Sequence, residues 1–122
     1  MKRTRANVGV WGEAIATKHL EAQGYTVLHR NWRHGHGELD IVACKAELIV
    51  FVEVRTRTSD TFGSPEETLS PRKRAKLIAT AQAYLDEHGL GEAQWQIDVI
   101  VIELDAKNAV QRLEQIEAAI EG

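Results

Sequence analysis

The feature that most constrains the fold is the run Leu48-Ile49-Val50-Phe51-Val52, which is apolar at every position. A strand with one face in water alternates apolar and polar residues, so an unbroken apolar run is typical of a strand covered on both faces. The sequence therefore predicts a central strand in a sheet that has helices on both sides. Charged residues, Glu53, Arg55 and Arg57, follow on the same strand and share one of its faces.

Helical and strand-like segments surround this central strand. Periodicity, caps and turn residues predict, in order, a helix over residues 8–23, strands over 25–30, 38–43 and 48–57, a helix from Ser70 to Gly89, and a strand over 95–104. The second and third strands are separated by so few residues that they form an antiparallel hairpin. Residues 109–122 suit an edge strand and a helix equally.

The first helix is expected to have Asn7 as its N-cap and Gly24 just beyond its end, and the second helix to have Ser70 as its N-cap. A chain of 122 residues is the usual size of one domain. We therefore expect a single α/β domain over residues 1–122, with an αβββαβ core in which helices flank a central mixed sheet.

Composition narrows the classes of function. Cys44 is the only cysteine, which excludes a disulfide framework and fits a reducing compartment, and no apolar stretch is long enough for a signal peptide or a membrane helix. We expect a cytoplasmic protein without a membrane partner. The net charge of −3 is unevenly distributed, because residues 1–76 carry 13 basic and 9 acidic residues while residues 77–122 carry 2 and 9. A basic face is therefore compatible with the acidic total.

Two acidic residues are candidates for metal binding. A turn over residues 44–47 would place Asp40 opposite Phe51 and diagonal to Glu53 on one face of the hairpin. Burying two carboxylates together is costly unless a cation compensates, and oxygen ligands suit Mg²⁺ or Mn²⁺. The alternative is that Asp40 and Glu53 pair with arginines such as Arg33 and Arg55 in an ordinary ion network.

Basic residues open the second helix. Arg72, Lys73, Arg74 and Lys76 lie in its first turns, where cations oppose the helix dipole. Helix N-termini bind phosphate readily, so this cluster is a candidate contact for the backbone of a nucleic acid. A solvated surface that only aids solubility is the competing interpretation.

Three motifs in their order and spacing resemble the YraN-like family of bacterial proteins. They are Gly12-Glu13, Gly37-Glu38-Leu39-Asp40 and Phe51-Val52-Glu53-Val54-Arg55. The resemblance covers nearly the whole chain. It implies a place in the PD-(D/E)XK nuclease superfamily, a restriction-endonuclease-like fold and similarity to the archaeal Holliday-junction resolvases.

The resemblance also implies roles for individual residues. Asp40 and Glu53 would bind the metal, with Glu13 pointing at the same place. Arg55 stands where the superfamily usually has a lysine, and a guanidinium can hold a phosphate but cannot act as a neutral amine. Independently of the resemblance, we expect contacts to DNA from four basic residues: Arg57, Arg72, Lys73 and Arg74.

Two functions remain open at this point. The first is an endonuclease that depends on Mg²⁺ or Mn²⁺ and acts on DNA, including branched DNA, for which a homodimer would be suitable. The second is a catalytically inactive module that binds nucleic acid or a protein partner on the same fold, and Arg55 is the residue that favours it.

Overall fold

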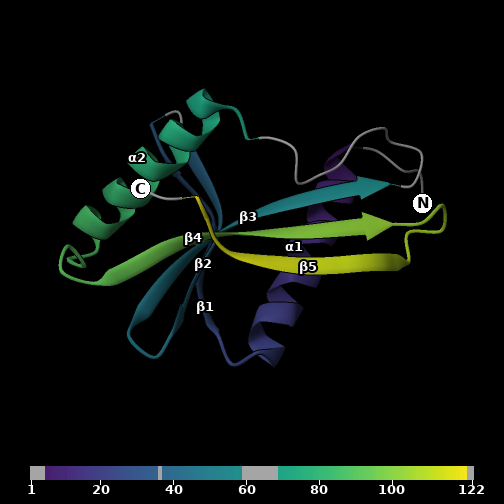
Figure 1. Ribbon diagram of the computed structural model, residues 1–122, viewed down its shortest axis with the longest axis horizontal. Helices are drawn as coiled ribbons and strands as arrows, with labels where there is room; N and C mark the ends of the chain where they lie inside the picture. Colours follow the sequence, from purple (N-terminus) through teal and green to yellow (C-terminus); the bar gives the residue numbers. More distant parts are fainter. Residues whose placement is uncertain (1–4, 36, 59–68, 121–122) are drawn as a thin grey trace.

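The computed structural model describes residues 5–35, 37–58 and 69–120. Their elements, in chain order, are α1 (Arg5–Ala22), β1 (Thr26–His34), β2 (Gly37–Lys45), β3 (Leu48–Thr58), α2 (Pro71–Glu87), β4 (Gln94–Leu104) and β5 (Val110–Ile120). The strands form one sheet in the order β1-β2-β3-β4-β5, and all neighbours are antiparallel except β3 and β4 (Figure 1). The expected α/β class with an αβββαβ core is confirmed.

The two helices cover opposite faces of the sheet, as the apolar run in β3 predicts. Val50 and Val52 point to the α1 side, where they pack with Ala16 and Leu20, while Phe51 packs on the α2 side. All five side chains are at most 2% exposed. The loop that leads from β3 into α2, residues 59–68, lies outside the described residues.

The helix ends agree with the sequence at three of four places. Gly24 has φ of 93° and follows α1, and Gly89 has φ of 67° and follows α2, which is the left-handed conformation that glycine adopts most easily. Ser70 caps α2 by accepting a hydrogen bond from the Lys73 N–H at 3.2 Å. The expected N-cap of α1 is wrong, because the helix begins at Arg5 and Asn7 lies inside it.

The hairpin between β2 and β3 is tighter than expected. Its turn consists of two residues, Ala46 and Glu47, rather than four, and Ala46 has φ of 54°. Shortening the turn by two residues moves the register by two, so Val42 rather than Asp40 pairs with Phe51. Because side chains alternate with a period of two, the shift leaves every residue on its expected face.

The end of the chain forms a strand, which settles the ambiguity of residues 109–122 as far as Ile120. Asp98 on β4 is fully buried and accepts hydrogen bonds from the side chains of Gln96 and Gln115 at 2.8 Å and from the Ala118 N–H at 2.9 Å. Buried carboxylates are tolerated when hydrogen bonds satisfy them in this way. Asp98 is thus a structural acceptor that fastens β5 to β4.

Two glycines allow the helices to approach the sheet closely. A Cβ at Gly12 of α1 would overlap the Thr56 hydroxyl of β3, and a Cβ at Gly37 of β2 would overlap the Thr80 hydroxyl of α2. By contrast, a Cβ at Gly9 has no atom within 4 Å. The residues that follow Gly12 and Gly37 are Glu13 and Glu38, so each close contact fixes the backbone next to an acidic side chain.

The difference between the two helical glycines gives a direct test of this packing. We expect Gly12→Ala to destabilise the protein by about 1–3 kcal/mol, because the cost of overpacking exceeds the gain in helix propensity. Gly9→Ala, in the same helix, should instead stabilise it by about 0.5–1 kcal/mol. Urea unfolding of both variants measures the two changes, and equal effects would contradict the proposed contact with Thr56.

Candidate functional site

The candidate site lies where β2 and β3 separate. Their last paired residues at this end are Ile41 and Val52. Beyond them, the Val54 N–H of β3 donates a hydrogen bond to the carboxylate of Asp40, with 2.9 Å between N and Oδ2. The Val54 N–H lies beyond the last pair of the β2–β3 ladder, and the side chain of Asp40 accepts its hydrogen bond in place of a backbone carbonyl. This hydrogen bond holds the Asp40 side chain in position.

Asp40 and Glu53 form a pair of carboxyl groups. Continuing the register by one position sets Asp40 opposite Glu53 on the same face of the sheet, and both side chains line one cleft. Burial raises the pKa of Asp40 to about 8, with further contributions from the charge of Glu53 and from the hydrogen bond to Glu53, while the Val54 N–H opposes the shift. The pair therefore favours either a bound proton or a cation at neutral pH.

Two more carboxylates, Glu13 and Glu38, lie within electrostatic reach of Asp40. Burial raises the pKa of Glu13 on α1, and the charge of Asp40 adds to this rise, while a hydrogen bond from Asn31 and the nearby Arg30 lower it. The charge of Glu38 raises the pKa of both Glu13 and Asp40. Negative charge from three elements, α1, β2 and β3, thus converges on one place.

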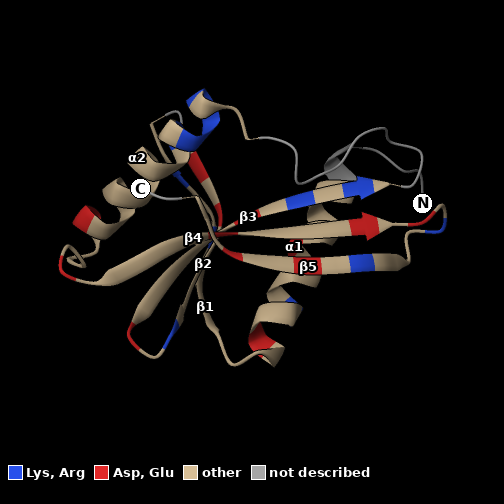
Figure 2. Ribbon diagram, in the orientation of Figure 1, with Lys and Arg blue, Asp and Glu red and all other residues tan. Residues whose placement is uncertain are grey.

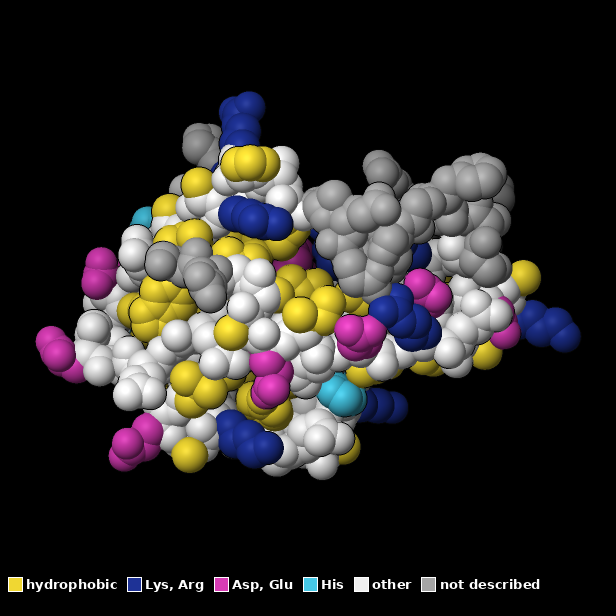
Figure 3. Space-filling view, in the orientation of Figure 1, with side chains coloured by type: hydrophobic (Ala, Val, Ile, Leu, Met, Phe, Trp, Pro, Cys, Tyr) yellow, Lys and Arg dark blue, Asp and Glu magenta, His cyan; other side chains and the backbone are white. Residues whose placement is uncertain are grey.

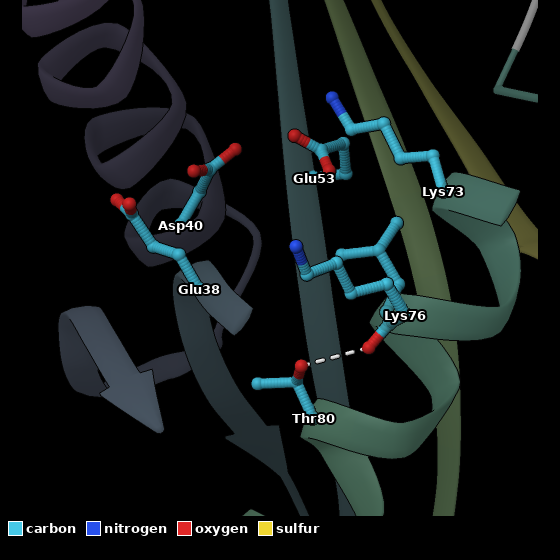
Figure 4. A pocket seen from close by; sticks show the side chains of 7 residues that line it. Glu38, Asp40, Glu53, Lys73, Lys76 and Thr80 are labelled. Atoms are coloured by element: carbon cyan, nitrogen blue, oxygen red, sulfur yellow. Dashed lines mark hydrogen bonds between the residues drawn. The ribbon is translucent and has the colours of Figure 1, made fainter. Parts of the chain in front are cut away.

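A cleft of about 240 Å³ opens beside the carboxyl pair (Figure 4). It is lined by Glu38, Asp40, Glu53, Lys73, Lys76, Leu77 and Thr80. Figure 4 shows the side chains of Lys73 and Lys76 reaching from α2 towards the carboxylates of β2 and β3. The cleft therefore has an acidic wall formed by the sheet and a basic wall formed by the helix.

Arg55 lies outside this cleft. Together with Arg74 it lines a second cavity of about 180 Å³, whose other walls are Leu69, Val99, Ile116, Ala119 and Ile120. Arg57 and Arg72 line neither cavity. The structure thus divides the basic residues that the sequence grouped together, because Lys73 faces the carboxylates whereas Arg74 turns to Arg55.

The sequence analysis did not place two charged residues, Glu38 and Lys76, in the cleft with the carboxyl pair. Glu38 shares a strand face with Asp40 by alternation, and this signal was present in the sequence. Lys76 follows Lys73 by three residues, which places both on one face of α2. Which face of α2 meets the carboxylates depends on how the helix packs, and no local pattern fixes that.

In the ranges that the structure describes, no group of three or more His, Cys, Asp and Glu side chains is arranged to hold a metal ion. None of the described helices is long and apolar enough to cross a membrane.

Comparisons with known proteins place the chain among bacterial relatives. The model of a family described as "Uncharacterised protein family UPF0102" matches residues 12–102. A UPF0102 protein of Moorella thermoacetica is 44% identical over 119 residues, covering 98% of this chain and 99% of the relative. A UPF0102 protein of Roseiflexus castenholzii is 41% identical over 122 residues, covering 99% of this chain and 98% of the relative.

One solved structure, Pyrococcus furiosus SfsA in complex with Ca²⁺, is similar with a TM-score of 0.41 and 16% sequence identity. The match covers 96% of this chain but only 65% of the SfsA chain.

The raised pKa of Asp40 predicts how the stability of the metal-free protein depends on pH. Between its usual value of 3.8 and about 8, the folded state binds a proton that the unfolded state lacks. Stability should therefore fall as the pH rises through this window. Asp40→Asn keeps an acceptor for the Val54 N–H and should abolish this part of the loss.

Thermal unfolding in a chelator at about pH 5 and about pH 9 measures the effect. Asp86→Asn, at an exposed position of α2, is the control for loss of one negative charge. A loss of stability that is equal in wild type and Asp40→Asn would show that Asp40 is not the group responsible.

Proposed function

The chain belongs to the UPF0102 family, which confirms the resemblance to YraN-like proteins, and we propose that it is a metal-dependent nuclease that acts on DNA. The observation that carries the proposal is the pair of Asp40 and Glu53, which lie opposite each other on β2 and β3 in a cleft that also contains two lysines. A place in the PD-(D/E)XK superfamily is part of this proposal and rests on the three motifs of the sequence.

The donor set of the cleft fits Mg²⁺ or Mn²⁺. Asp40 and Glu53 offer only oxygen, which these ions prefer, and Mg²⁺ keeps several waters, so that two protein carboxylates are sufficient ligands. Burial and the negative charge of Glu53, which raise the pKa of Asp40, disfavour its ionised form, and a bound cation would offset both effects. When bound, such an ion supplies a Lewis acid that polarises a phosphoryl oxygen and lowers the pKa of water.

The protein's own residues supply the rest of the site. The Val54 N–H fixes the orientation of Asp40, and Glu13 adds negative charge next to it. Lys73 and Lys76 would bind the oxygens of a phosphodiester and stabilise the charge that develops on them. An ammonium group thus reaches the cleft from α2, although β3 carries Arg55 where the superfamily usually has lysine.

A second function has its own support. Arg55 lines a separate cavity, and the described residues hold no group of three metal-binding side chains. Both observations fit a module that binds nucleic acid or a protein partner without cleaving it.

Substrate shape and assembly follow from the family resemblance alone. We propose branched DNA as the substrate and a homodimer as the assembly. A dimer with two-fold symmetry carries two equivalent sites, which match the two-fold symmetry of a four-way junction. Arg57 and Arg72 would add contacts to phosphates outside the cleft. A cytoplasmic location remains a prediction from the single cysteine.

Cleavage of a four-way DNA junction in Mn²⁺ tests the proposed function. Asp40→Asn and Glu53→Gln should each lower the rate by roughly 100-fold or more, because the ion's stabilisation of the transition state amounts to several kcal/mol. Glu92→Gln, in the turn before β4, removes the same charge away from the cleft and should cleave as wild type does.

Titration calorimetry with Mn²⁺ in the absence of DNA separates binding of the ion from turnover. Wild type should bind Mn²⁺ and Asp40→Asn should not. Cleavage by both Asp40→Asn and Glu53→Gln at the wild-type rate would indicate a contaminating enzyme. If the wild type and the variants all bind the junction and none cleaves it, the binding module replaces the nuclease as the proposed function.

A further inference from the structure

The cavity of Arg55 and Arg74 contains two cations that face the same space. Arg55 comes from β3 and Arg74 from the first turns of α2. Within the described residues, none of the recorded ion pairs joins either guanidinium to a carboxylate. Two guanidinium groups at one cavity repel each other, so an anion between them would be stabilised by both.

The other walls of this cavity are apolar. Leu69, Val99, Ile116 and Ile120 line it, and Val99 and Ile120 are only 7% and 6% exposed. In the space-filling view, basic side chains at the start of α2 stand next to a surface of hydrophobic side chains (Figure 3). A ligand that fits both features carries an anionic group joined to a flat or apolar body, as a nucleotide does.

The position of the cavity relates it to the carboxylate cleft. Glu53 lines the cleft and Arg55 lines the cavity, and the two residues lie on one face of β3, about 6.6 Å apart along the strand. Lys73 and Arg74 are likewise neighbours on α2 but belong to the cleft and the cavity respectively. Two residues along a strand span a distance comparable to that between successive phosphates of a polynucleotide.

We infer that this cavity is a nucleotide subsite, in which Arg55 and Arg74 bind the phosphate next to the one that Lys73 and Lys76 hold beside Asp40 and Glu53. The base of that nucleotide packs against Val99, Ile116 and Ile120. A single strand of nucleic acid then runs along β3 beside the first turns of α2, with one phosphate in each cavity. The inference rests on the proposed function for the identity of the substrate as nucleic acid, but not on cleavage.

Charge is distributed as this path requires. Basic residues occupy the first turns of α2 and the last part of β3, whereas acidic residues lie at the opposite end of α2 (Figure 2). A nucleic-acid strand that runs along β3 past Glu53 and Arg55 therefore passes beside the basic part of α2.

Methyl NMR with thymidine monophosphate as the probe tests the subsite in a chelator, where no metal contributes. The methyl groups of Val99, Ile116 and Ile120 should shift on titration. Thymidine alone and inorganic phosphate alone should each bind at least about tenfold more weakly, because each lacks one half of the contacts. Arg55→Gln and Arg74→Gln should each weaken binding by roughly tenfold.

Lys18→Gln serves as the charge-matched control, since Lys18 is exposed on α1 and α1 covers the other face of the sheet. It should bind the probe as wild type does. Both arginine variants must keep the wild-type spectrum without ligand, and the exposed position of Arg74 makes a folded variant available if Arg55→Gln unfolds.

The outcomes separate this inference from the proposed function. If Asp40→Asn still binds the probe and neither the wild type nor any variant cleaves DNA, the nuclease is rejected and the subsite is retained. Cleavage that depends on Asp40, together with unchanged probe binding in both arginine variants, would reject the subsite and keep the nuclease. Shifts confined to the cleft of Lys73 and Lys76, or equal affinity for inorganic phosphate, would also overturn the inference.

Discussion

The hydrogen bond from the Val54 N–H to Asp40 is the interaction on which the candidate site depends. It lies beyond the last pair of the β2–β3 ladder, at the end of the hairpin opposite its turn. There it joins the two strands and orients a carboxylate at the same time. Without it, a backbone donor would lose its partner and Asp40 would be free to turn to solvent. The cleft exists because the strands separate there and a side chain replaces the next backbone bond.

The surrounding packing keeps charged groups near that bond. Gly12 lets α1 approach Thr56 of β3, which holds Glu13 close to the sheet. Gly37 lets the start of β2 approach Thr80 of α2, which holds Glu38 close to that helix. The apolar part of β3 ends at Val52, next to Glu53, and gives both helices a surface to pack on. Rigid, buried neighbours thus position side chains that would otherwise repel one another.

Sequence patterns predicted the elements and the faces better than the contacts between elements. The apolar run at residues 48–52 identified the central strand, and the caps at Ser70 and Gly89 located α2, because these signals are local. The pair of Asp40 and Glu53 was expected on one face, and the error of two residues in the turn did not change this, since strands have a period of two. An error of one residue would have separated the pair.

What the sequence could not specify was the rotation of α2 about its axis and the course of β5. These determine that Lys73 and Lys76 face the carboxylates while Arg74 faces Arg55. Residues 109–122 fitted two structures equally, and the preference for a strand comes from pairing with β4 and from the acceptor Asp98. Both are tertiary effects that override local propensity.

The parallel pairing of β3 with β4 has a consequence for the order in which the two cavities take shape during folding. Asp40 and Val54 are 14 residues apart in a hairpin, so the carboxyl pair can form from local contacts. The cavity of Arg55 and Arg74 needs α2, β4 and β5, and therefore waits for β4 to dock beside β3 after a long crossover. Contacts between distant parts of a chain form more slowly than local ones, because closing the intervening loop costs entropy. A nascent chain that lacks β4 and β5 would therefore carry an acidic pair without the arginine cavity beside it.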